Sequence, residues 1–418
     1  MDFAVSKGHL ERAITVGAAQ ITIAPAPNTL STKASERTIV TAGKFEARFA
    51  AVDGRTYLST LYGAPNASIV NSVTGSPERV STSDVIDATF APQGGLESLV
   101  QQGNFAYTDN LPSEKRTQAW ASTARYTPAD HMIVLQGEPR LSNSGMLTTA
   151  KTVHINRATG DAEAEGGVKS TYSDLKEQPY GALLASSSPI HVTARTMTAH
   201  NSPGVALYSG NARLWQDANV IQAPSIQFDR NRRSVLAQGT ADQPVLTILA
   251  DTHKNASPSI PPQDQSAKSA KNVPGSASAP ISITAAKLTY ADSERRIHYE
   301  GGVIARSEDF TASAKTADAY LLPRSQNAKS STAPGQLDHM VAEGDVMIQE
   351  PKRRAEGQKL VYTAAEDKFV LTGGPPSIFD AEQGKITGVS LTFFRRDDRV
   401  LVEGEAGSSV VTTTRVAQ

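Results

Sequence analysis

Histidine and cysteine are the residues that most often bind metals or attack substrates, and neither occurs here in a pattern suited to that chemistry. The chain has eight histidines and no cysteine. None of the histidines forms H-x-H or H-E-x-x-H, spacings that place two imidazoles beside one metal ion. We expect two of them, His191 and His200, at the surface. The sequence therefore predicts no metal site, no disulfide and no cysteine nucleophile.

Other catalytic signatures are missing from the sequence as well. No G-x-S-x-G presents a serine nucleophile, and no G-x-x-x-x-G-K-[ST] cradles a phosphate. The acidic pair Asp397–Asp398 falls in a predicted turn, where carboxylates are usually solvated. A carbohydrate-active enzyme would need paired carboxylates on an inner face, whereas the charged residues here cluster in turns. We therefore predict no catalytic residue, no enzymatic activity and no cofactor.

The charge balance excludes another class of function. Lys and Arg total 41 and Asp and Glu total 42, a formal net charge of -1 over 418 residues. Nucleic-acid binding needs a clustered basic surface, and the basic runs here are short, such as Lys352–Arg354 in a predicted turn. We predict no nucleic-acid partner. Aromatic residues make up only 6 % of the chain, a composition typical of many thin strands.

A repeat of hairpin length organises the chain. Counted from a small residue at position 0, apolar residues recur at positions 3, 5 and 12, and glycine recurs at position 16. Uninterrupted copies end at Gly137, Gly166, Gly210, Gly239, Gly301, Gly373 and Gly404, and looser copies end at Gly63, Gly103 and Gly344. About ten copies indicate a repeat protein in which each unit packs on its neighbours.

The spacing inside each copy predicts a β-hairpin. Positions 3 and 5 face one side of a strand, and positions 12 and 14 face that side on the return strand. The copy KLVYTAAEDKFVLTGG, residues 359–374, has a charged turn between two such strands. A helix is excluded because the apolar period is two. The glycine lies within an extended run, so we expect it to allow a bulge or a sharp bend.

The clarity of the repeat divides the chain into segments. Residues 1–35 are predicted to be poorly ordered or an edge, and residues 36–115 to be divergent repeats. Residues 116–250 and 281–418 carry clear repeats. Residues 251–280 are rich in Ser, Pro, Ala and Lys and predict a disordered loop, with a shorter one at Pro323–Gln336. Repeat arrays tolerate insertions at turns, so neither loop is expected to be a domain boundary.

The last repeats resemble a known family. The elements that carry the resemblance are a V-x-x-G opening, a small residue, an aliphatic residue followed by an aromatic one, and an L-x-G close, here Val341–Gly344, Ala355–Gly357, Leu360 with Tyr362, and Leu371–Gly373. This pattern resembles the OstA-like, LptA-type lipopolysaccharide-transport domains. Tyr208–Asp229 is similar to it again, and the resemblance covers about residues 115–406.

The resemblance implies an all-β fold, a repetitive antiparallel β-jellyroll with the shape of a V or a folded taco. Its inner groove would shield the acyl chains of lipopolysaccharide. Exposing an acyl chain of twelve to fourteen carbons to water costs on the order of 10 kcal/mol, at roughly 0.8 kcal/mol per methylene. This cost favours a continuous apolar trough.

Inward repeat positions are the candidate lipid-binding residues, although packing alone would explain any one of them. The candidates are Ile133, Leu135, Val153, Ile155, Met197, Tyr208, Leu214, Ile226, Phe228, Val235, Leu288, Tyr290, Ile297, Val303, Val346, Ile348, Leu360, Tyr362, Phe369, Leu371, Leu391, Phe393, Val400 and Val402.

The predicted function is a non-enzymatic periplasmic bridge or adaptor that binds lipopolysaccharide or a similar glycolipid during transport to the outer membrane. The first residues contain no apolar run of signal-peptide length, so an export signal or membrane anchor is expected outside this sequence. Expected partners are other jellyroll proteins of the same type, joined by edge-strand pairing, with self-association included and Ser408–Val416 as a candidate edge. The alternative is a structural β-repeat scaffold or adhesin that binds protein or glycan.

Overall fold

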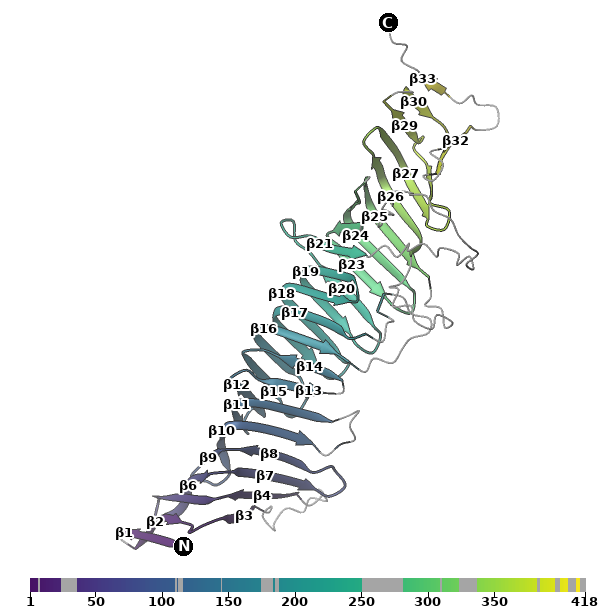
Figure 1. The fold of residues 1–418 in the computed structure, drawn as a ribbon. Helices are drawn as coiled ribbons and strands as arrows, with labels where there is room; N and C mark the ends of the chain where they lie inside the picture. Colours follow the sequence, from purple (N-terminus) through teal and green to yellow (C-terminus); the bar gives the residue numbers. More distant parts are fainter. Residues whose placement is uncertain are drawn as a thin grey trace, which may run out of the picture. The chain divides into compact units, whose positions relative to one another are not determined.

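The computed structural model describes most of the chain as β-strands connected by short turns (Figure 1). The described residues are 1–6, 8–23, 36–109, 111, 116–143, 145–173, 183–184, 188–249, 281–308, 310–322, 337–381, 384–394, 399–404 and 411–413. Every strand pairing given for them is antiparallel, and none of them lies in a helix. The predicted loops 251–280 and 323–336 and the pair Asp397–Asp398 lie outside the described residues.

The chain forms two compact units, each described here by itself. Unit 1 comprises Met1–Leu175 and Pro189–Ala212, and unit 2 comprises Lys176–Ser188 and Arg213–Gln418. The division falls within strand β18 (Val205–Gln216). The segment boundaries drawn from the clarity of the repeat stay predictions, because they describe sequence similarity and not contacts.

Unit 1 contains the strands up to β17 and the first part of β18. Their bounds are β1 Asp2–Ser6, β2 His9–Ile14, β3 Ala19–Ile23, β4 Glu36–Ala42, β5 Lys44–Val52, β6 Arg55–Ala64, β7 Ala67–Val73, β8 Arg79–Ser83, β9 Val85–Phe90, β10 Leu96–Asp109, β11 Thr117–Thr127, β12 Met132–Gln136, β13 Arg140–Asn143, β14 Met146–Thr149, β15 Thr152–Asn156, β16 Ala162–Tyr172 and β17 Ile190–His200.

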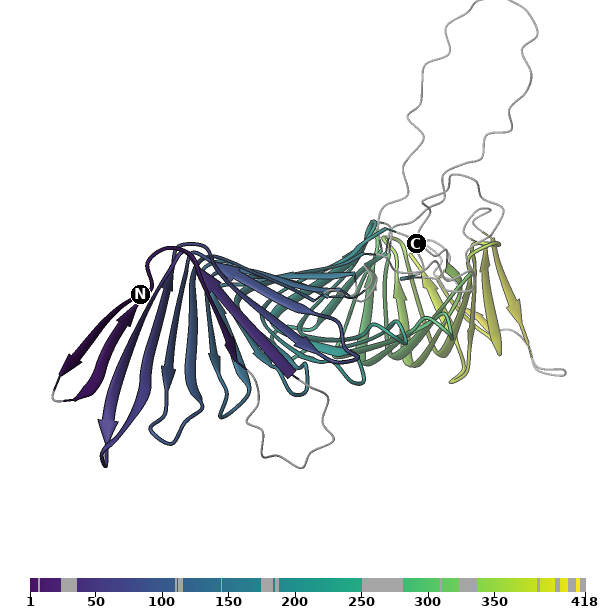
Figure 2. The ribbon, with the colours of Figure 1, turned by 90° about the horizontal axis from the view of Figure 1, so that it is seen from below.

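These strands form two walls that meet along a ridge. Wall A of unit 1 runs β1-β2-β5-β6-β9, then through one half of β10 and of β11 to β12 and β15. Wall B runs β3-β4-β7-β8, then through the other halves of β10 and β11 to β13 and β14. The long strands β10, β11, β16 and β17 belong to both walls and join them. Figure 2 shows the strands of unit 1 (purple to blue) descending from this ridge.

Unit 2 repeats the same plan. Its strands after β18 are β19 Asn219–Asp229, β20 Ser234–Gln238, β21 Val245–Leu249, β22 Ile281–Ala285, β23 Lys287–Ala291, β24 Arg296–Arg306, β25 Thr311–Leu321, β26 Leu337–Gln349, β27 Arg353–Thr363, β28 Lys368–Thr372, β29 Ser377–Asp380, β30 Gly384–Thr387, β31 Ser390–Phe394, β32 Arg399–Glu403 and β33 Val411–Thr413. Wall A contains β20, β23, β28, β31 and β32, and wall B contains β21, β22, β29, β30 and β33. The strands β24 to β27 cross both walls. The prediction of an all-β, antiparallel, V-shaped jellyroll is confirmed.

The repeat glycine marks the point where the chain passes from wall A to wall B. At these corners two successive residues have positive φ, as in Gly103–Asn104, Gly137–Glu138, Gly166–Gly167, Gly210–Asn211, Gly301–Gly302, Gly344–Asp345 and Gly373–Gly374. Register shifts occur at the same places in β10, β16, β24 and β26. The predicted bend at the glycine is therefore confirmed, and it takes the form of a bulge with a left-handed backbone.

Inside the walls, the repeat positions pair with one another across the strands. Position 5 lies opposite position 12 in each clear hairpin, as Tyr290 lies opposite Ile297 and Tyr362 opposite Phe369. Adjacent hairpins continue the row, since Phe369 also lies opposite Phe393. Cross-strand apolar pairs of this kind each stabilise a sheet by roughly 0.2–1 kcal/mol. Because the same pairing recurs from hairpin to hairpin, the interior is built from one repeated contact.

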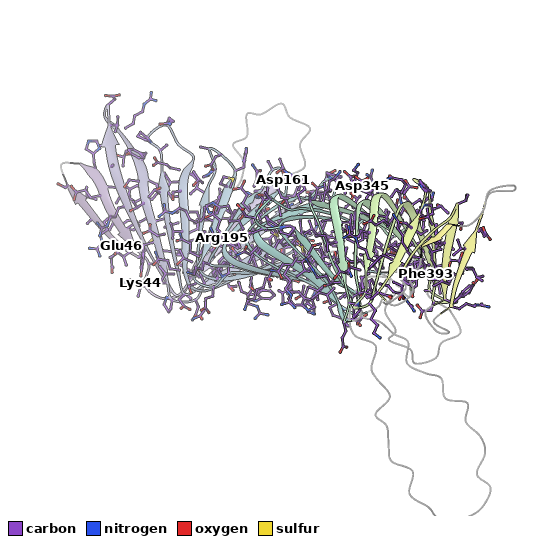
Figure 3. The ribbon with its side chains drawn as sticks, turned by 90° about the horizontal axis from the view of Figure 1, so that it is seen from above. Lys44, Glu46, Asp161, Arg195, Asp345 and Phe393 are labelled. Atoms are coloured by element: carbon purple, nitrogen blue, oxygen red, sulfur yellow. The ribbon has the colours of Figure 1, made fainter. Side chains whose placement is uncertain are left out.

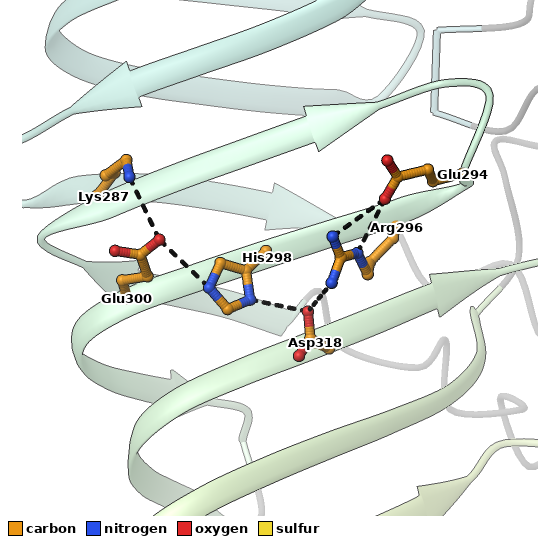
Figure 4. A network of polar contacts seen from close by, with 6 residues as sticks. All are labelled: Lys287, Glu294, Arg296, His298, Glu300 and Asp318. Atoms are coloured by element: carbon orange, nitrogen blue, oxygen red, sulfur yellow. Dashed lines mark hydrogen bonds and ion pairs between the residues drawn. The ribbon is translucent and has the colours of Figure 1, made fainter.

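The outer face of wall A in unit 2 carries a network of charged side chains (Figure 4). His298 on β24 places Nδ1 at 2.8 Å from Asp318 Oδ1 and Nε2 at 3.3 Å from Glu300 Oε1. Arg296 and Lys287 extend this network along the strands. Charged residues are therefore not confined to turns, as the sequence had suggested. These half-exposed pairs are worth about 0–1 kcal/mol each and keep this face in water.

The corner of β24 gives a direct test of the glycine requirement. A Cβ on Gly301 would lie 2.5 Å from the Cβ of Ala286, whereas a Cβ on Gly302 meets nothing within 4 Å, and both residues have φ near +80°. Gly302→Ala should therefore cost about 1–2 kcal/mol, the penalty of a left-handed L-residue. Gly301→Ala should cost roughly 1–3 kcal/mol more, because it adds overpacking. Urea unfolding of the two variants measures the difference, and equal losses would contradict close packing at the corner.

Candidate functional site

A groove opens between the two walls of unit 1. It is a cavity of about 480 Å³, and its apolar lining includes Leu99, Phe105, Tyr126, Ile133 and Ile155. These residues come from β10 to β15 and lie on the inner sides of both walls. The outer rim is polar and includes Asn71, Arg79, Asp109, Asn143, Arg157 and Asn201. The volume falls within the usual range for ligand sites, roughly 300–1,000 Å³.

A second, smaller groove lies inside unit 2, near its last strands. Its volume is about 300 Å³, and aromatic residues dominate its apolar surface: Phe310, Phe369, Phe393 and Phe394. Phe393 stands on the yellow strands in Figure 3. Phe310 and Phe369 pack edge to face, with ring centroids 6.2 Å apart. Glu308, Glu350, Arg353 and Arg399 form the polar part of the lining, two acids and two bases.

Away from these grooves the interior is closed by packing. Within unit 1, Val153, Met197 and Tyr208 have 1 % or less of their surface exposed. Tyr208 shares a hydrogen bond with Tyr172 through their hydroxyls (2.6 Å), and burial raises the pKa of Tyr208 to about 12. In this part of unit 1, large side chains from the two walls therefore meet and fill the space between them.

In unit 2 a short segment from outside the walls helps to close the interior. Leu183 and Leu184 are buried, although they belong to no strand. The backbone N–H of Leu183 donates to Tyr290 Oη (2.8 Å), and Arg233 Nη1 donates to the carbonyl of Leu184 (3.0 Å). Tyr290 also donates a very short hydrogen bond to Asp292. Burial and the nearby Asp292 carboxylate raise the pKa of Tyr290, so this hydroxyl stays protonated and available as a donor.

The predicted groove residues fall into three groups. Ile133, Leu135 and Ile155 line the groove of unit 1, and Ile348, Phe369, Phe393 and Val400 line that of unit 2. Tyr362 and Val402 are half-buried and line neither groove. The others are buried core residues that line neither groove: Val153, Met197, Tyr208, Leu214, Ile226, Phe228, Val235, Leu288, Tyr290, Ile297, Val303, Val346, Leu360, Leu371 and Leu391.

Several groove residues were not among the sequence candidates. Leu99 and Phe105 lie in a divergent repeat, where the alternation around Gly103 could have indicated them. Phe310 precedes a strand after a turn, and Arg79 and Arg157 have no fixed position in the repeat. The repeat therefore identified the inward face of each hairpin, but not where the walls separate.

Comparison with known proteins bears on unit 2 most directly. Residues 282–399 match the family model described as "LptA/(LptD N-terminal domain) LPS transport protein". The match confirms the resemblance to LptA-type domains that the repeats showed. It runs from β22 to the start of β32 and includes every lining residue of the smaller groove except Val400.

The other comparisons add little to the LptA/LptD assignment. A crystal structure of LptH from Pseudomonas aeruginosa, described as the LptA homologous periplasmic component of the lipopolysaccharide transport device, is 16 % identical. The similarity covers 31 % of this chain and 87 % of that one, with a TM-score of 0.27. A search of curated proteins gives no match.

The described residues show neither a metal centre nor a membrane-spanning helix. No group of three or more His, Asp or Glu side chains is placed there to hold a metal ion. Nor does that part of the chain contain a helix long and apolar enough to cross a membrane.

Burial of Tyr208 predicts a loss of stability at high pH. Its pKa rises from about 10 in an unfolded chain to about 12 in the fold, so the folded state holds the proton more tightly. The stabilisation is complete below pH 10 and is lost as the pH rises from 10 toward 12, by at most about 1.4 kcal/mol per pH unit. Urea unfolding between pH 9 and 11.5 should show a shallower decline for Tyr208→Phe than for the wild type. The same change at the exposed Tyr62 should leave the slope unaltered, and identical slopes for all three proteins would contradict the prediction.

Proposed function

We propose that this chain is a non-enzymatic lipid carrier that shelters acyl chains of lipopolysaccharide between its walls during transport to the outer membrane. The observation that carries the proposal is the pair of apolar grooves, one inside each unit, lined by inward repeat positions. The family match over residues 282–399 supports the choice of ligand. The periplasm is the compartment that we propose for this activity, because a lipid must cross it in a sheltered form.

The physical argument rests on the groove lining. Transfer of one methylene of an acyl chain from water into an apolar groove is favourable by roughly 0.8 kcal/mol, so burial of even a few methylenes favours binding. Ile133 and Ile155 face each other across β12 and β15, and Phe369 faces Phe393 across β28 and β31. Each groove therefore offers a flat row of apolar side chains on one wall, with the other wall opposite it.

The polar groups nearby support a carrier better than an enzyme. The His298–Asp318 pair on the outer wall, with 2.8 Å between Nδ1 and Oδ1, lines neither groove. In the groove of unit 2, Arg353 pairs with Asp380 at 2.8 Å, and both side chains are largely buried. This pair links the neighbouring strands β27 and β29 of wall B, so it is explained by the fold without a catalytic role.

The ends of each V suggest how such carriers connect. Among the described strands, β1 and β3 each pair with one neighbour, as do β32 and β33. Apolar residues stand exposed beside the first pair of edges, including Phe3, Val5 and Ile23. Open edges with exposed apolar residues favour pairing with another strand. We propose that another jellyroll of the same type, or a second copy, docks on these edges.

Site-specific photo-crosslinking tests the groove proposal. A photoactivatable residue at Ile133 or Phe369 should capture lipopolysaccharide, because both side chains line a groove. The matched outward positions are Val134 and Val370, the next residues in the chain, which face the opposite side of the strand. Both are half-buried, as Ile133 is, whereas Phe369 is buried. These should capture little lipid. Equal labelling at inward and outward positions would contradict the carrier and favour a scaffold that meets glycolipid only at its surface.

Deletion tests the edge proposal separately. Removing Ser408–Val416 takes away β33 and should weaken self-association or binding to a jellyroll partner, as measured by sedimentation velocity. Removal of only Ala417–Gln418 is the control. Unchanged association after the longer deletion would show that this edge is not used.

A further inference from the structure

The two grooves differ in charge, and the difference points to the part of the ligand that each one contacts. The lining of the unit 1 groove contains three arginines, Arg79, Arg125 and Arg157, and one acid, Asp109. All its other lining residues are neutral. The unit 2 groove contains two acids and two arginines. The unit 1 groove is therefore an apolar slot with a surplus of positive charge, and its unit 2 counterpart is balanced.

Two of these arginines approach the groove from opposite walls. Arg79 begins β8 on wall B, where it lies opposite Asp109 in register. Arg157 follows β15 on wall A, and its backbone N–H donates to the carbonyl of His131 (2.8 Å). Both side chains line the same groove and are exposed at its surface. Their positive charges partly offset the rise that burial causes in the pKa of Tyr107, another residue of the lining.

Neither guanidinium is neutralised by a carboxylate of the described residues. Arg79 forms no ion pair with a carboxylate of the described residues, and the facing Asp109 accepts the backbone N–H of Thr117 through Oδ1 (2.9 Å). Arg157 stacks on the Tyr126 ring, 5.4 Å from its centroid, and donates a long hydrogen bond to Tyr126 Oη (3.4 Å). Tyr126 is part of the apolar lining, so Arg157 stands directly beside the surface that an acyl chain would cover.

Charge-assisted hydrogen bonds from arginine to phosphate are among the strongest in proteins, and the planar guanidinium matches phosphate geometry. An apolar slot with two uncompensated arginines at its rim therefore complements a molecule with acyl chains at one end and phosphate at the other. We propose that the groove of unit 1 binds the phosphorylated head group of an acylated lipid, with Arg79 and Arg157 holding phosphate from opposite walls. This inference rests on the proposed carrier function and deepens it, because it assigns the head group to one unit.

The experiment uses the full chain with a photoactivatable residue at Ile133, which reports occupancy of this groove alone. The probes are phosphorylated lipopolysaccharide and the same material after chemical dephosphorylation. Wild-type protein should be labelled at lower concentrations of the phosphorylated form. Arg79→Gln and Arg157→Gln should each shift labelling by that form about tenfold, the equivalent of 1.4 kcal/mol, with little effect on the dephosphorylated form. Arg79→Lys should recover part of the loss, and Arg399→Gln in the other groove should have no effect.

Each outcome separates the head-group site from the carrier function. Equal labelling of wild-type protein by both probes would overturn the head-group site and leave the carrier intact. No labelling by either probe would overturn the carrier itself. Equal loss of both probes in the arginine variants would show that these arginines only support the fold. Displacement of lipid by millimolar inorganic phosphate would show a site for free phosphate and would overturn the proposal as stated.

Discussion

The fold depends on one backbone constraint, the left-handed corner at which the chain passes from wall A to wall B at seven of the repeat glycines. An ordinary L-residue pays about 1–2 kcal/mol for that conformation, and glycine does not. The corner also needs space, because the side chain of a neighbouring strand lies where a Cβ would stand, as Ala286 does at Gly301. Glycine meets both conditions at once. The repeat glycines therefore recur along the sequence at the same interval as the corners recur in the fold.

Once the corners are fixed, side-chain alternation determines the rest of the interior. The two halves of a long strand such as β24 present their inward residues to each other across the V, as Ile297 and Val303 do on either side of Gly301. Whether the space between the walls is filled or open then depends on side-chain size and on the width of the V at that point. Tyr208 and Tyr290 fill it, whereas the hairpins around Ile133 and Phe369 leave room.

Properties that each repeat has by itself, such as its strands and its corner, could be predicted from the sequence. Properties that depend on contacts between repeats, such as the position of an open groove, could not. The alternation in Leu360, Tyr362 and Phe369 is local, so strands, hairpin register and corners followed from it. The position of an open groove depends on contacts across the walls, which no local period records. The burial of Leu183 is a long-range event of the same kind, because its partner Tyr290 lies in a different hairpin. Most groove candidates are therefore buried and line neither groove, and their contact with lipid stays a prediction.

The Leu183–Leu184 segment has a consequence for how tightly unit 2 could hold a lipid. It is tethered to the chain that it covers, so it occupies its place at a high effective concentration without needing any affinity of its own. Under the carrier function proposed above, a lipid that reached Tyr290 would compete with it, and its apparent affinity would be the intrinsic affinity multiplied by the fraction of time that the segment is away. An intramolecular competitor of this kind keeps apolar surface from water when no ligand is present. For the proposed carrier it would also favour release, which a carrier needs as much as capture.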